Sequence, residues 1–277
     1  MTRKLVSLAI FSVCMLYAAH AQQHRLTKLW STDSALKVPE SVLIDPQSNV
    51  LYVSNIDGKA DEKDGKGSIG KVSADGKIIA VDWVSGLHAP KGMGIRGNNL
   101  YVADLDAIAI IDTKKGTLTK RIPVQDAVFL NDVTVDKSGV VYVSDSRAGK
   151  VFRMQGEKVE LYLDKLKNPN GLLANGNDFY LLDSGTLYLV DKNKNLVKIV
   201  EGMEPDTDGI VPVKAGEFIV SCWGGSVYYV HKDGNKQKLL DTREQKINTA
   251  DIQYDPAKAV LYIPTFYRNS ITAYKVQ

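Results

Sequence analysis

The stretch Phe129-Leu-Asn-Asp-Val-Thr-Val-Asp-Lys-Ser-Gly-Val-Val-Tyr-Val-Ser-Asp145 contains the unit from which this chain is built. Apolar residues alternate at Val133 and Val135, a Lys-Ser-Gly turn follows, and a β-branched run begins at Val140. This order of features predicts two strands joined by a tight turn. The polar residue Asn131 stands just before the first strand, and the equivalent position recurs along the chain.

The unit repeats about every 40 residues. We call the recurring polar slot the channel position, and it is occupied in turn by Glu40, Lys91, Asn131, Asn170, Asp208 and Ala250. The separations between these residues are 51, 40, 39, 38 and 42. A period near 40 made of short strands is typical of a β-propeller with one blade per repeat. We therefore predict an all-β fold, a six-bladed β-propeller of four-stranded antiparallel blades.

The two ends of the predicted domain complement each other. The sixth repeat has room for only three strands before the chain stops at Gln277, and the alternating segment 25–30 has no blade of its own. We predict that this N-terminal strand completes the last blade, because it would protect an otherwise open sheet edge.

The N-terminus has the features of a secretory signal peptide. Basic residues at Arg3 and Lys4 precede an apolar run from Leu5 to Ala18, and Ala19-His20-Ala21 ends the segment. We expect residues 1–21 to be cleaved and residues 22–277 to form one domain, exported to the periplasm or secreted. A retained membrane anchor is the alternative, although the run is short for a membrane span.

Composition limits the classes of partner. Cleavage removes two basic residues and no acid, so 33 basic and 32 acidic residues remain and the net charge is +1. Such a chain lacks the basic footprint of a protein that binds nucleic acid or an anionic membrane. Cys222 is then the only cysteine, so the stability of the fold must come from its core and not from a disulfide. We expect a monomer that acts on a small molecule.

The channel positions carry oxygen donors. The first strand of each propeller blade lines the central channel, so these side chains should meet at one mouth. Glu40 and Asp208 offer carboxylates, and Asn131 and Asn170 offer amide oxygens, a set that suits Ca²⁺. Mg²⁺, Mn²⁺ and Zn²⁺ remain alternatives. Each residue could instead only shape the turn into its strand, but glutamate is a poor turn former.

Four motifs resemble the calcium site of a known family. They are Pro39-Glu40-Ser41-Val42, Leu130-Asn131-Asp132-Val133, Pro169-Asn170-Gly171-Leu172 and Asp206-Thr207-Asp208-Gly209-Ile210. They are similar to motifs of the senescence-marker-protein (regucalcin)/gluconolactonase superfamily of six-bladed propellers, whose relatives include diisopropylfluorophosphatases and paraoxonases. The resemblance implies a calcium-dependent hydrolase of lactones or related esters.

The resemblance also implies residue roles. Glu40, Asn170 and Asp208 would bind the metal, and Asn131 would bind it directly or through water and substrate. By the same analogy, Asp208 would be the catalytic base or nucleophile. Two other classes of function stay open: a propeller that keeps its cation for stability and only binds a ligand or protein, and a metal-free lyase or synthase-like propeller, which the two acids disfavour.

Two features depart from an all-oxygen mouth. Lys91, preceded by His88, puts a cation where a ligand oxygen could stand, and we expect Lys91, His88 and Asn131 to contact substrate, unless Lys91 folds outward to solvent. The first repeat also carries an insertion over the mouth, residues 57–67. Its acids Asp57, Asp61 and Asp64 could hold a surface cation, but their pattern favours a solvated loop.

Overall fold

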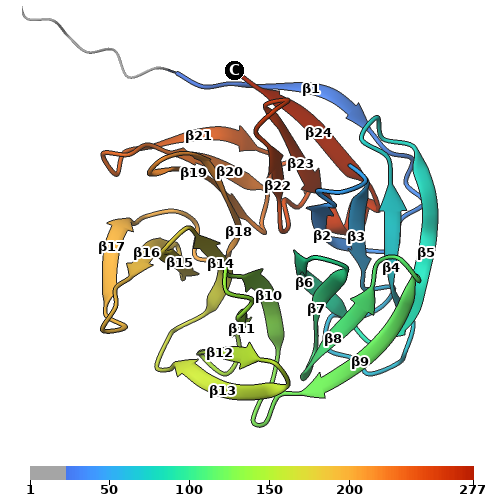
Figure 1. The fold of residues 1–277 in the computed structure, drawn as a ribbon. Coiled ribbons are helices and arrows are strands. Elements are labelled where there is room, and N and C mark those ends of the chain that lie inside the picture. The colour runs from blue at the N-terminus through green and yellow to red at the C-terminus, as the bar shows by residue number, and fades with distance from the viewer. Residues whose placement is uncertain (1–22) are drawn as a thin grey trace, which may run out of the picture.

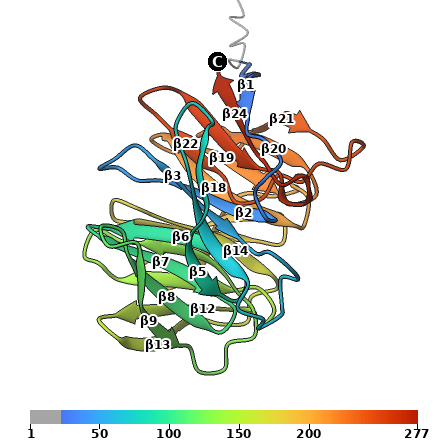
Figure 2. The same ribbon diagram turned by 90° about the vertical axis from the view of Figure 1, so that its right-hand side faces the viewer.

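The computed structural model describes residues 23–277, and the predicted signal peptide lies outside them. The described chain forms six four-stranded antiparallel sheets arranged as a closed ring around a central channel (Figure 1), seen from its edge in Figure 2. The prediction of a six-bladed propeller is confirmed. The described residues contain no helix that is long and apolar enough to cross a membrane.

The innermost strands of the six blades surround the channel in chain order. They are β2 (Pro39–Ile44), β6 (Pro90–Arg96), β10 (Leu130–Val135), β14 (Pro169–Asn175), β18 (Thr207–Lys214) and β22 (Gln253–Asp255). The second strands are β3 (Leu51–Asn55), β7 (Asn99–Asp104), β11 (Val141–Asp145), β15 (Asp178–Asp183), β19 (Glu217–Cys222) and β23 (Val260–Pro264).

The remaining strands lie progressively further from the channel. The third strands are β4 (Gly67–Val72), β8 (Ala107–Asp112), β12 (Lys150–Gln155), β16 (Thr186–Val190), β20 (Ser226–Val230) and β24 (Ile271–Val276). The outermost strands are β5 (Ile78–Leu87), β9 (Thr117–Pro123), β13 (Lys158–Leu163), β17 (Leu196–Val200), β21 (Lys236–Asp241) and, in the sixth blade, β1 (Leu26–Ser31). One 3₁₀ turn, η1 (Phe266–Arg268), follows β23 at the mouth of the channel.

The ring closes through the N-terminal strand. β1 pairs antiparallel with β24, from Leu26 opposite Val276 to Ser31 opposite Thr272, and both views show the two strands side by side (Figures 1 and 2). Trp30 of β1 packs on Tyr262 of β23 with ring centroids 5.8 Å apart. The pairing covers the edge of β24, which confirms the predicted completion of the last blade.

Neighbouring blades are held together by apolar side chains from facing sheets. Tyr180 of the fourth blade lies 4.7 Å, centroid to centroid, from Phe218 of the fifth. Both belong to a cluster that also contains the buried Cys222. Burial raises the pKa of the Cys222 thiol, so this sole cysteine of the described chain is an unreactive core residue.

Candidate metal centre

Five of the six channel positions lie inside the innermost strands and not before them, which corrects the sequence-based placement; only Ala250 precedes its strand, β22. In the third blade Leu130 pairs with Asp145, and the next pair is Val133 with Val143. Between these two pairs Asn131 and Asp132 oppose the single residue Ser144, which is a β-bulge. The same register shift occurs in the first, second, fourth and fifth blades. Because a bulge re-aims side chains, it turns the channel residues of these five blades toward the mouth.

Buried carboxylates hold the segments that lead into the bulges. Asp145, at the end of β11, accepts hydrogen bonds from the backbone N–H groups of Val128 at 2.6 Å and Phe129 at 3.1 Å. Asp104 accepts them from residues 88 and 89, and Asp183 from residues 167 and 168. We missed these acids in the sequence, although an Asp or Asn ends the second strand of the first four blades.

A cavity of about 310 Å³ lies at the mouth of the channel. It is lined by five of the six channel residues, Glu40, Lys91, Asn131, Asn170 and Asp208, and by Ile56, Ala60, Phe129, Ser146, Arg147, Asn168, Asp206, Thr207, Trp223, Phe266 and Tyr267. Ala250 lies in an apolar cluster with Phe266. His88 does not line the cavity, so the structure gives it no contact with a ligand bound there.

Two buried oxygens in this cavity have no hydrogen-bond partner. They are Oε2 of Glu40 and Oδ1 of Asn170. The amide nitrogen of Asn170 donates to Oδ1 of Asp208 at 2.9 Å, which holds these two side chains together. Buried oxygens without donors are costly, and a cation would satisfy both. The oxygens of Glu40 and Asn170 therefore fit the coordination of a hard metal ion.

The fourth predicted ligand is oriented by a short chain of hydrogen bonds. Nδ2 of Asn131 donates to the Ser146 hydroxyl at 3.0 Å, and that hydroxyl donates to the carbonyl of Pro169 at 2.7 Å. Because the amide nitrogen is engaged, the amide oxygen of Asn131 is the group available to a metal, a water molecule or a substrate.

The electrostatics of the channel also favour a cation. Burial, followed by the charges of Asp208 and Asp251, raises the pKa of the Glu40 carboxyl well above its ordinary value. Burial and the charge of Asp251 do the same to the pKa of Asp208. A divalent ion between these two carboxyls would stabilise both of them as anions.

Deeper acids contribute to this field. Asp251 is half-buried, its carboxylate accepts the Ser41 hydroxyl at 2.5 Å, and burial raises its pKa to about 7. Asp132 of β10 is buried, and its carboxylate accepts the backbone N–H of Leu172 at 2.5 Å. Within the described residues no three His, Cys, Asp or Glu side chains form a metal-binding group, so the candidate centre depends on its two amides as well as its two carboxylates.

Lys91 is turned inward and is 2% exposed, so the alternative of an outward lysine is wrong. Its ammonium donates to the carbonyl of Ala89 at 2.9 Å and lies 4.2 Å from the ring centroid of Phe129. Burial lowers the pKa of Lys91 to about 8, against the attraction of Glu40. The cavity therefore has a basic side beside its acidic centre.

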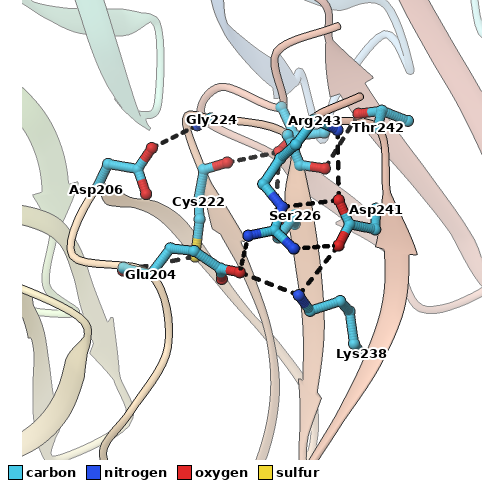
Figure 3. A network of polar contacts seen from close by, with 11 residues as sticks. Glu204, Asp206, Cys222, Gly224, Ser226, Lys238, Asp241, Thr242 and Arg243 are labelled. Carbon is cyan, nitrogen blue, oxygen red and sulfur yellow. Dashed lines mark hydrogen bonds and ion pairs between the residues drawn. The ribbon is translucent and has the colours of Figure 1, made fainter. Parts of the chain in front are cut away.

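An ion-pair network anchors the loop that leads to Asp208 (Figure 3). Oε1 of Glu204 lies 3.0 Å from Nζ of Lys238 and 2.9 Å from Nη1 of Arg243. Asp241 bridges the two cations, at 3.1 Å from Lys238 and 2.8 Å from Nε of Arg243. Nearby, Asp206 accepts the backbone N–H of Gly224 at 2.6 Å. These contacts tie β21 and the β19–β20 turn to the entrance of β18.

We expect the contribution of Glu204 to the stability of the fold to depend on pH. Burial opposes ionisation of Glu204, but the neighbouring Tyr228 hydroxyl and Lys238 ammonium outweigh it and lower the pKa to about 2. A carboxyl group whose pKa is lowered by folding stabilises the fold fully at pH values above its pKa in the unfolded chain. This stabilisation is lost as the pH falls toward the folded-state pKa of about 2. Glu204→Gln should therefore cost about 3 kcal/mol at pH 7. In urea unfolding the difference from wild type should shrink by more than half at pH 3, and a difference independent of pH would contradict this role.

Comparisons with known proteins agree with this architecture. The SMP-30/Gluconolactonase/LRE-like region family matches residues 38–265. Among solved structures, a gluconolactonase from Xanthomonas campestris superposes with a TM-score of 0.69 at 15% identity, covering 93% of this chain and 96% of that one. A putative gluconolactonase gives 0.68 at 15% identity, with 92% of each chain covered.

A third structure shares the fold but belongs to a protein with a different activity. Virginiamycin B lyase from Staphylococcus aureus superposes with a TM-score of 0.64 at 12% identity, covering 91% of this chain and 99% of that one. At such low identities these structures show the fold alone. No curated protein matches this chain. Since the family match spans all of the innermost strands, the chain belongs to the SMP-30/gluconolactonase/LRE-like family.

Proposed function

We propose that this protein is an exported, monomeric, calcium-dependent hydrolase of lactones or related esters. The observation that carries the proposal is the pair of unpartnered buried oxygens on Glu40 and Asn170, which face the same cavity as Asp208 and Asn131. The family membership and the gluconolactonase-like fold support a lactonase-like propeller. Glu40, Asn170 and Asp208 would hold the ion, with Asn131 as a direct or water-bridged ligand.

The chain supplies the groups that hydrolysis needs. A bound Ca²⁺ would provide Lewis acidity that polarises a carbonyl or phosphoryl oxygen. Asp208 uses Oδ1 to accept the Asn170 amide, and its Oδ2 accepts no hydrogen bond from the described residues. That oxygen is free to take a proton from water as a general base or to attack as a nucleophile. Asn131 would orient the substrate beside it, in the direction fixed by Ser146.

The cavity walls control access of water. Trp223, Phe266 and Tyr267 form an edge-to-face aromatic cluster on the side of the fifth and sixth blades, with centroids 4.7 to 6.1 Å apart. Apolar walls around the acids lower the local dielectric, which strengthens the interaction of Asp208 and Glu40 with any cation or developing charge between them.

A lactone panel followed by proton release tests the proposal. With residues 22–277 and Ca²⁺, hydrolysis of at least one lactone or ester should be detected, should stop when a chelator is added and should return with excess Ca²⁺. Asp233→Asn, in an exposed outer turn, serves as a control that should behave as wild type. Calcium binding by calorimetry without turnover of any lactone or ester would instead favour a ligand-binding propeller.

A further inference from the structure

We propose that Arg147 selects substrates that carry a carboxylate, and that Asp61 of the first-blade insertion occupies Arg147 until such a substrate arrives. The inference rests on the proposed lactone or ester hydrolysis and names the substrate class of that site. The insertion, residues 57–67, connects β3 to β4 and lies over the mouth, where its Ala60 lines the cavity beside Arg147.

Arg147 is held at the rim by one acid and one ring. Its Nη2 lies 3.1 Å from Oδ2 of Asp61, its only ion pair with the described residues. Its guanidinium carbon lies 4.2 Å from the ring centroid of Phe129. The ammonium of Lys91 lies at the same distance from that centroid. A buried and a rim cation are thus gathered around a single cavity-lining phenyl ring.

This basic side of the cavity is short of negative charge. Lys91 forms no ion pair within 4.0 Å anywhere in residues 23–277 and keeps only the carbonyl of Ala89 as an acceptor. The acids Glu40 and Asp208 belong to the proposed metal centre. The side of the fifth and sixth blades is aromatic. A substrate with a carboxylate would therefore place it toward the second and third blades, between Lys91 and Arg147.

The Asp61 contact is suited to exchange. The side chains of Arg147 and Asp61 are 52% and 48% exposed, and ion pairs with this exposure contribute little to stability. A carboxylate inside the cavity can accept two parallel hydrogen bonds from a guanidinium, and such pairs are stronger than single exposed contacts. The substrate would replace Asp61 on Arg147, and the insertion would be released from the third blade.

The competing explanation is that the pair only fastens the insertion. The insertion also has an ion pair with the neighbouring second blade, in which Nζ of Lys63 lies 2.5 Å from Oδ2 of Asp106. A fastening role predicts that breaking either pair has the same effect. A role in selection predicts that Asp61→Asn and Arg147→Gln act in opposite directions, because Asp61 competes with the substrate and Arg147 binds it.

The test uses one lactone in two forms, with a free carboxylate and with that carboxylate replaced by a carboxamide. The measured quantity is the preference, the ratio of kcat/KM for the carboxylate form to that for the carboxamide form. Arg147→Gln should lower the preference about 10- to 100-fold, the size of a lost charge-assisted hydrogen bond. Asp61→Asn should raise it about two- to fivefold. Asp106→Asn should leave it unchanged.

The inference is overturned if Arg147→Gln leaves the preference unchanged, or if Asp61→Asn and Asp106→Asn shift it equally. If the wild-type protein hydrolyses neither form of the lactone, the result contradicts the proposed hydrolase function and leaves the role of Arg147 to a binding experiment. Calorimetry with the corresponding lactams, which resist hydrolysis, then tests directly whether Arg147 binds the carboxylate of the ligand. Weaker binding of the carboxylate lactam to Arg147→Gln than to wild type would support the inference, and equal binding would overturn it.

Discussion

Asp208→Asn is expected to lower kcat/KM for lactone hydrolysis by about 1000-fold or more, because it removes both a proposed metal ligand and the proposed base or nucleophile. It should also weaken Ca²⁺ binding by at least about 10- to 100-fold, the loss seen even for outer partners of metal ligands. Proton release on a lactone substrate and calorimetric titration with Ca²⁺ measure the two effects.

The same substitution should stabilise the calcium-free protein. Glu40 is a buried acid whose ionisation the charge of Asp208 disfavours, and the amide leaves one charge fewer beside Glu40. The melting temperature without calcium should rise by about 2–4 °C. Wild type at a calcium concentration of 100 Kd should gain about 5–10 °C over its calcium-free form. A variant that keeps this full calcium-dependent gain would show that Asp208 is not a ligand.

Deleting residues 22–31 is expected to leave the protein largely unfolded or aggregated. The deletion removes β1, exposes the whole edge of β24 and takes away Trp30 from the cluster shared by the first and sixth blades. Domains are stable by only about 5–15 kcal/mol, and the loss of a complete strand with its aromatic anchor is of that order. Circular dichroism and gel filtration of the truncated chain measure the effect.

Two point variants test whether the packed side chain of Trp30, and not only the presence of β1, contributes to stability. Trp30→Ala should lower the free energy of unfolding by about 2–3 kcal/mol, because Trp30 packs on Tyr262. Leu29→Ala, on the same strand but 50% exposed, should change it by less than about 0.5 kcal/mol. A truncated chain that melts as cooperatively and at the same temperature as wild type would contradict the closure of the ring by β1.

The fold could be predicted because its repeat is visible in the sequence. The spacing near 40 set the number of blades, and the alternating segment before the first repeat indicated how the ring closes. The bulges could not be predicted, because one extra residue in a strand does not disturb a short apolar pattern. They place five of the six channel positions inside the strands, and these five residues still meet at the mouth.

The candidate site was recognised only in part. Oxygen donors recurring at one position of the repeat indicated Glu40, Asn131, Asn170 and Asp208. The deeper acids were missed, because the space that holds them is created by glycines on neighbouring strands. A Cβ on Gly92 would lie 2.4 Å from Oδ1 of Asp132, and one on Gly209 would lie 2.5 Å from Oδ1 of Asp251. Such complementarity between blades is a tertiary property.

The sequence also could not predict the direction of the Lys91 side chain or the ion-pair partner of Arg147. A lysine in a polar slot is compatible with an outward or an inward side chain, and burial against Phe129 decides between them only in the assembled ring. Arg147 meets Asp61 across 86 residues of sequence, through an insertion that interrupts the repeat.

The location of a bound ion in crystals of the protein grown with Ca²⁺ tests the central claim most directly. The account predicts one ion at the mouth of the channel, at about 2.3–2.6 Å from oxygens of Glu40, Asn170 and Asp208. A channel mouth without an ion, or an ion bound only by the acids of the insertion at the surface, would contradict it.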